Sequence, residues 1–179
     1  KEPIIIVAGE PNSVFLEIFF KSIKDHHYKH PLIIIASKEL LQQQMEKLGF
    51  VFEINILSSN YKEFNKLNNK KINLIDIKYK FTNCFEKISD KSNSYINESF
   101  ETALKIILQN KFSKFINGPV SKKYFLMGKT LGITEYLAKK TKRNDKVIML
   151  IFNKKVSVSP LTTHLALKNV HKNITKQKI

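Results

Sequence analysis

Short runs of β-branched residues alternate with helical patterns through the first part of this chain, and this alternation restricts the possible folds most strongly. Each run is long enough for a buried strand but too short for a buried helix. Between the runs, apolar residues recur at helical spacing, with Ser13 and Ser37 placed to cap the helices and Gly49 placed to end the second one. The pattern predicts an α/β domain with a largely parallel sheet. The first three predicted strands are Ile4–Ala8, Leu32–Ala36 and Phe50–Ile56.

The middle of the chain is less regular, and the alternation returns after it. Asn, Lys and Ser dominate from Ser58 to Asn97, which predicts a long, irregular and partly exposed connection that is the least well packed part of the chain, with one possible strand at Ile72–Ile77. The whole pattern is typical of an α/β fold whose parallel-rich sheet is covered by helices on both faces. The later predicted elements are a helix along Phe100–Leu108, a strand at Lys114–Ile116, helices at Lys122–Met127 and Thr134–Lys142, paired strands at Lys146–Phe152 and Val156–Ser159, and a helix beginning at Ala166–Lys172.

The composition excludes several function classes. The formal net charge is +16, but the lysines are spread along the chain, and the joint abundance of Lys, Ile and Asn fits an A/T-rich genome. We therefore expect no nucleic-acid partner, although a basic surface would attract a phosphorylated ligand. No apolar run approaches the ~20 residues of a membrane helix, so we expect no membrane partner.

Cysteine and clustered histidine give no sign of a reactive or metal-binding site by themselves. Cys84 is the single cysteine, which fits a cytoplasmic protein, and no basic cluster marks it as reactive. His26, His27 and His30 lie close together, but no Cys or carboxylate pattern accompanies them. We expect them at an exposed helix end and in the loop that follows it.

The segment from Phe115 to Leu167 contains the motifs that are best suited to chemistry. Gly118 and Pro119 follow a predicted strand, as Gly9 to Pro11 do earlier, and glycines at such positions let a backbone approach an anion. Thr134 can hydrogen-bond a phosphate, and its spacing also fits a helix N-cap. His164 follows two threonines after a strand, where it fits either a metal ligand or a structural histidine.

Four short motifs follow one another along the chain: Gly9-Glu10-Pro11, Asn117 to Lys122, Gly132 to Tyr136 and Leu161 to Leu165. Together they resemble the 4-hydroxythreonine-4-phosphate dehydrogenase (PdxA) family. The resemblance implies the two-lobed α/β fold of isocitrate and isopropylmalate dehydrogenases, with residues 1–179 as the N-terminal portion of a truncated family member. It also implies a cytoplasmic homodimer when full length, NAD or NADP as cofactor, and a divalent metal (Zn, Mg or Co).

The activity that the resemblance implies is the oxidation, with decarboxylation, of 4-phosphohydroxy-L-threonine in pyridoxal phosphate biosynthesis. On the matching motifs, Thr134 is expected to bind the phosphorylated substrate and His164 to be the first of three metal-ligand histidines. No residue is assigned as catalytic, and no residue is assigned to the cofactor. We expect the 179-residue chain alone to be inactive and to bind metal weakly, because one histidine supplies only one of three ligands.

Two alternatives remain open from the sequence. Ile133 stands where the resemblance implies a substrate-binding histidine, and Asn12-Ser13-Val14 replaces the family's residues after Gly9-Glu10-Pro11. These differences favour a related dehydrogenase that acts on another 4-phosphorylated hydroxy acid. The second alternative is a truncated binding module that has no catalytic activity.

Overall fold

A computed structural model describes the whole chain except residues 144–146, 164 and 177–179. The chain divides into two compact units, Lys1–Met127 and Gly128–Ile179, and each is described by itself. The first unit contains β1 (Ile4–Val7), α1 (Phe15–Asp25), β2 (Leu32–Ala36), α2 (Lys38–Lys47), β3 (Ile54–Leu57), η1 (Phe64–Lys66), β4 (Ile72–Asp76), η2 (Asp90–Ser92), α3 (Asn93–Asn110), β5 (Phe115–Asn117) and η3 (Lys122–Leu126). The second contains α4 (Ile133–Lys140), α5 (Leu167–Val170) and η4 (His171–Asn173).

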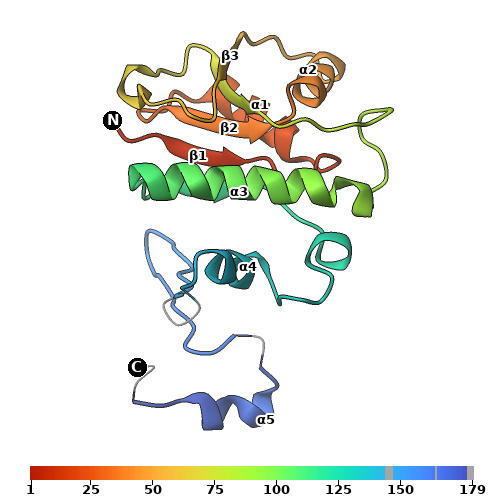
Figure 1. Cartoon of the computed structure of the whole chain (residues 1–179). Helices are drawn as coiled ribbons and strands as arrows, with labels where there is room; N and C mark the ends of the chain where they lie inside the picture. Colours follow the sequence, from red (N-terminus) through yellow and green to blue (C-terminus); the bar gives the residue numbers. More distant parts are fainter. Residues whose placement is uncertain (144–146, 164, 177–179) are drawn as a thin grey trace. The chain divides into compact units, whose positions relative to one another are not determined.

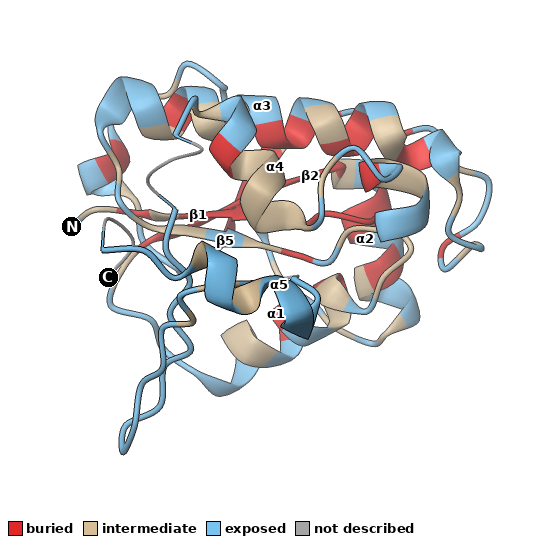
Figure 2. Cartoon of the chain, turned by 90° about the horizontal axis from the view of Figure 1, so that it is seen from below, coloured by how far each residue is buried: buried red, intermediate tan, exposed pale blue. Residues whose placement is uncertain are grey.

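The first unit is built on a five-stranded parallel sheet with the strand order β3-β4-β2-β1-β5. β1 pairs with β2 through Ile4 opposite Leu32, and with β5 through Ile5 opposite Phe115. Helices α1 and α2 lie on one face of the sheet, and α3 lies on the other (Figures 1 and 2). The predicted α/β fold with helices on both faces is therefore confirmed.

The period of two along each strand divides the isoleucines between two cores. On the side of α1 and α2, Ile6 and Ile34 pack with Phe19, Phe20 and Leu41 in one buried cluster. The alternate strand residues face α3, whose buried residues include Ile96, Phe100 and Ala103. Complete burial of a side chain such as Phe20 contributes about 2–3 kcal/mol, so these two layers provide much of the stability of the unit.

The predicted strand Phe50–Ile56 is wrong at its beginning, because β3 begins only at Ile54. The rings of Phe50 and Phe52 instead lie 5.5 and 6.2 Å from the ring of Phe20, measured between centroids. Their apolar alternation therefore comes from packing against the core beneath α1, and not from pairing in the sheet.

The expectation that Ser58–Asn97 is the least packed part of the chain is also wrong. This stretch contains β4, which is an internal strand paired with both β2 and β3, so the possible strand at Ile72–Ile77 is confirmed. Asn73 is buried because its side-chain amide donates to the carbonyl oxygens of Leu32 at 3.0 Å and Asn68 at 2.8 Å. A buried asparagine whose side-chain amide has both of these hydrogen bonds does not indicate an exposed loop.

The second unit is more open than the sequence pattern predicts. The paired strands expected at Lys146–Phe152 and Val156–Ser159 are represented, in the described residues, by one antiparallel bridge between Ile151 and Val158. The predicted helix from Ala166 is a single turn, α5, followed by η4. In the described part of the chain, none of the helices combines the length and the hydrophobicity that a membrane span requires.

Candidate functional site

The carboxyl ends of β1 and β5 meet at the point where the strand order reverses, which is the usual ligand position in an open parallel sheet. Here Gly9 has φ +74°, and a Cβ on Gly9 would clash with the carbonyl oxygen of Pro119. A Cβ on Gly118 would clash with the backbone of Ala8. The Glu10 amide donates to the Pro119 oxygen at 2.8 Å. The two glycines therefore let one loop pack on the other, and their contact leaves no room between them for an anion.

Glu10 is a buried carboxylate at this edge, with 3% of the residue exposed. It accepts hydrogen bonds from the Ser92 hydroxyl at 3.0 Å and from the Asn12 amide at 3.3 Å. Burial raises the pKa of Glu10, and the two hydrogen bonds oppose that shift. Since Ser92 directly precedes α3, Glu10 links the loop after β1 to the beginning of that helix.

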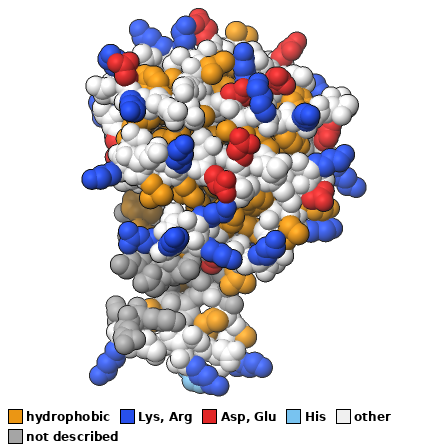
Figure 3. Space-filling view, in the orientation of Figure 1, with side chains coloured by type: hydrophobic (Ala, Val, Ile, Leu, Met, Phe, Trp, Pro, Cys, Tyr) orange, Lys and Arg blue, Asp and Glu red, His pale blue; other side chains and the backbone are white. Residues whose placement is uncertain are grey.

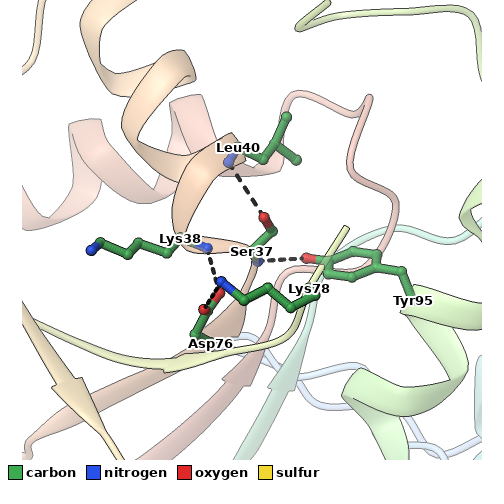
Figure 4. A network of polar contacts seen from close by, with 6 residues as sticks. All are labelled: Ser37, Lys38, Leu40, Asp76, Lys78 and Tyr95. Carbon is green, nitrogen blue, oxygen red and sulfur yellow. Dashed lines mark hydrogen bonds and ion pairs between the residues drawn. The ribbon is translucent and has the colours of Figure 1, made fainter. Parts of the chain in front are cut away.

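The beginning of α2 is occupied by side chains of the protein itself (Figure 4). The Ser37 hydroxyl accepts from the Leu40 amide at 3.4 Å, which confirms the predicted cap. Asp76, at the end of β4, accepts from the Lys38 amide at 2.8 Å and pairs with the Lys78 ammonium at 3.0 Å. The Tyr95 hydroxyl accepts from the Ser37 amide at 3.2 Å. These amides are therefore not available to an external anion.

In the second unit, Thr134 is the second residue of α4, a helix that begins next to Gly132. Gly132 is the N-cap and supplies no side-chain hydrogen bond, so the alternative of Thr134 as the cap is wrong. The first intrahelical bond runs from the Tyr136 amide to the Gly132 oxygen at 3.1 Å. The preceding amides and the half-buried Thr134 thus lie at the positive end of a helix, which is suited to phosphate.

Two polar atoms in the same segment are shielded from solvent without hydrogen-bond partners in the described part of the chain. They are the hydroxyl oxygen of Thr130 and one carboxylate oxygen of Glu135. The Glu135 oxygen lies 3.0 Å from the place that a Cβ on Gly132 would take, so this carboxylate folds back over the glycine. A shielded carboxylate oxygen without a donor is suited to a ligand that donates a hydrogen bond. The sequence motif contained Glu135 but gave no separate role to it.

His164 lies outside the described residues, so its assignment as a metal ligand stays a prediction. In the described ranges, no three His, Cys, Asp or Glu side chains form a group that could hold a metal ion. His26 and His27 are exposed after α1, as predicted, and His30 contacts the Glu2 carbonyl oxygen at 2.8 Å.

The remaining polar features are consistent with passive surface and core roles. Cys84 is 7% exposed, and burial raises its thiol pKa, as expected for an unreactive cysteine. On the face seen in Figure 3, Lys and Arg side chains are dispersed among acidic and apolar ones and form no single continuous patch.

Comparison with known proteins identifies the family to which this chain is related. The family model described as "Pyridoxal phosphate biosynthetic protein PdxA" matches residues 27–179. A curated 4-hydroxythreonine-4-phosphate dehydrogenase from Sulfurihydrogenibium sp. is 28% identical over 98% of this chain and 54% of the relative. One from Colwellia psychrerythraea is 26% identical, again over 98% of this chain and 54% of the relative. This chain therefore spans about half the length of the curated relatives that it matches.

Solved structures show the same fold. A 4-hydroxythreonine-4-phosphate dehydrogenase from Burkholderia phymatum superposes with a TM-score of 0.81 at 20% identity, over 99% of this chain and 55% of that one. The enzyme of that name from Klebsiella pneumoniae gives 0.80 at 17% identity, over 99% of this chain and 56% of that one. At these identities the structures establish the fold, and the family model establishes the relationship. The chain belongs to the PdxA family of pyridoxal phosphate biosynthetic proteins.

Proposed function

We propose that this chain is the N-terminal portion of a two-lobed 4-hydroxythreonine-4-phosphate dehydrogenase. Its reaction is the NAD-dependent oxidation and decarboxylation of 4-phosphohydroxy-L-threonine in pyridoxal phosphate biosynthesis. The observation that carries the proposal is the family match over residues 27–179, supported by the names of the curated relatives. The full-length enzyme is proposed to be a homodimer, with NAD or NADP accepting the hydride.

The proposed substrate site uses the beginning of α4. The Thr134 hydroxyl and the amides of the first helical turn would bind the phosphate region. The unpartnered oxygen of Glu135 would accept a hydrogen bond from a hydroxyl or ammonium group of the substrate. A ligand with a phosphate at one end and hydrogen-bond donors at the other matches this combination.

The metal is proposed from the family relationship. A bound divalent ion, Zn, Mg or Co, would supply positive charge that polarises an oxygen of the substrate. The described residues do not form such a site, and a structural or catalytic site needs three or four protein ligands. His164 would supply one ligand, so we derive no step of the reaction from the metal.

Ile133 favours a second candidate. It occupies the first position of α4, where the resemblance implies a substrate-binding histidine, and its side chain can neither donate nor accept a hydrogen bond. A related dehydrogenase that acts on another 4-phosphorylated hydroxy acid would fit this change. A non-catalytic binding module is the remaining alternative.

The proposal can be tested by fusing this chain to the part of the Sulfurihydrogenibium relative that it does not cover. We expect the fusion to reduce NAD in the presence of divalent metal and 4-phosphohydroxy-L-threonine. His164→Ala should abolish metal-dependent turnover, because it removes one metal ligand. His171→Ala, which changes an exposed histidine, is the control and should leave turnover unchanged. Near-normal turnover in the His164→Ala protein would show that the ligand assignment is wrong.

Thr134→Ala in the same fusion should raise KM while changing kcat little. One lost hydrogen bond to a phosphate costs ~1–3 kcal/mol, which corresponds to about 5- to 150-fold in affinity. Thr175→Ala, at an exposed threonine of the second unit, is the matched control. If the parent fusion is active only on a different phosphorylated hydroxy acid, the second candidate replaces the first. If it oxidises no such substrate, the binding module is favoured.

A further inference from the structure

The segment between β4 and η2 passes along the carboxyl edge of the sheet without regular structure. Residues 77–89, all of which the structure describes, contain neither helix nor strand, and we call them the crossing segment. In Figure 1 it is the yellow-green loop that leads toward α3. The segment begins at the end of β4 and reaches the loop after β1, and these two strands flank β2 in the sheet. It therefore lies at the edge where open parallel sheets bind their ligands.

Asn12 fastens the crossing segment to the loop after β1. Its side-chain oxygen accepts from the Glu86 amide at 3.0 Å, and its own amide donates to the buried Glu10 carboxylate at 3.3 Å. Within the segment, the Glu86 carboxylate accepts from the amides of Thr82 at 3.2 Å and Asn83 at 2.7 Å. One side chain thus closes the turn of the segment, and one other holds that turn against the sheet edge.

The crossing segment also buries two of its own side chains. The ring of Tyr79 lies 5.0 Å from that of Tyr95 in α3, between centroids, and the Cys84 thiol donates to the side-chain oxygen of Gln43 in α2 at 3.5 Å. Phe85, the residue after this cysteine, is 45% exposed and has φ +62°. A bulky residue adopts this conformation only where surrounding contacts enforce it, so the closed segment is strained.

We propose that the crossing segment is a lid on the carboxyl edge of the sheet, with the hydrogen bond between Asn12 and Glu86 as its latch. An irregular segment with few fastening contacts opens at a lower free energy than the whole unit unfolds. Release of the strain at Phe85 favours the open state further. Opening exposes the Cys84 thiol and frees the side chain of Asn12. The inference requires no catalytic activity and does not depend on the proposed function.

The test measures how fast excess iodoacetamide modifies Cys84 in the 179-residue chain, since the buried thiol reacts only when it is exposed. We expect a rate that low urea concentrations leave unchanged, because lid opening exposes little surface. Asn12→Ala should raise the rate about 3- to 10-fold, the effect of one lost hydrogen bond. Asn55→Ala is the matched control. It removes a side-chain hydrogen bond of 3.0 Å to Asn73 inside the sheet and should change the rate less than about twofold.

A second pair of variants separates the turn from its charge. Burial and, less strongly, the charge of Glu86 raise the pKa of the Cys84 thiol, so a change of charge alone alters its reactivity. Glu86→Ala and Glu86→Gln both remove that charge, but only the glutamine keeps an oxygen that can accept from Thr82 and Asn83. We therefore expect Glu86→Ala to react about 3- to 10-fold faster than Glu86→Gln.

Either of two results would overturn the inference. The first is a modification rate that follows the free energy of global unfolding at every urea concentration, as for a thiol that is released only when the whole unit unfolds. The second is an equal rate in the wild type and in Asn12→Ala, because a latch must slow opening. If Asn12→Ala does not fold, equal rates in Glu86→Ala and Glu86→Gln have the same meaning.

Discussion

Glu10 shows how a single residue can connect the sequence motif, the fold and the pH dependence of stability. Its carboxylate is buried beside the contact between Gly9 and Pro119, and burial raises its pKa. A raised pKa means that the folded state favours the protonated form. The stabilising contribution is therefore complete below the ordinary pKa of about 4.3 and is lost as the pH rises through the higher pKa of the folded state.

We predict that Glu10→Gln makes the free energy of unfolding less dependent on pH above about pH 4. For each unit by which the pKa of Glu10 is raised, the wild type loses about 1.4 kcal/mol of unfolding free energy as the pH rises, and the variant does not. The glutamine amide can donate to the Ser92 oxygen, since the Ser92 hydroxyl has a second acceptor in the Ser89 carbonyl oxygen at 3.1 Å.

Urea unfolding at several pH values measures this effect, with the exposed Glu98→Gln in α3 as the control. Parallel pH profiles for the wild type and Glu10→Gln would show that burial of Glu10 has no net effect on its ionisation. The sequence placed Glu10 in a motif after the first strand. It could not show the burial, because that depends on Ser92, which is distant in the sequence.

At the scale of elements, sequence patterns predicted those strands and helix ends that depend on neighbouring residues in the sequence. The predicted strand Leu32–Ala36, the Ser37 cap and the stop at Gly49 agree with the structure, and the strand predicted at Ile4–Ala8 ends one residue earlier, at Val7. Each of these depends on propensity or on a cap close in sequence. β3 and β4 were predicted less well. The apolar alternation of Phe50 and Phe52 suggested a strand, but both rings pack against Phe20. Asn73 suggested a loop, but its side chain donates a hydrogen bond to the carbonyl oxygen of Leu32 inside the sheet.

The internal position of β4 leads to a prediction about local stability. Backbone amides of Ile72–Asp76 should exchange with solvent as slowly as those of β2, since both strands are paired on two sides. Amides of residues 147–152 should exchange orders of magnitude faster in the isolated chain, because they lie in an exposed segment. Native-state hydrogen exchange measures both, and fast exchange in β4 would contradict its position between β2 and β3.

At the scale of the whole molecule, the family and the fold class could be predicted from the sequence, whereas the full set of site residues could not, because it depends on contacts between distant parts of the fold. The motifs keep their order over nearly the whole chain, which was sufficient to identify the PdxA relationship. The proposed site depends on residues that come from distant parts of a longer fold. Thr134 is described at the beginning of α4, while His164 is not described, so the geometry between them stays a prediction.

We propose that this chain contributes one part of a dehydrogenase site, which the uncovered half of the family fold completes. The most direct measurement is metal-dependent NADH formation from 4-phosphohydroxy-L-threonine, compared between the 179-residue chain alone and its fusion to that half. We predict no turnover by the chain alone, because it supplies one of three expected metal ligands, and clear turnover by the fusion. Equal turnover by both proteins, or turnover by neither, would contradict this claim.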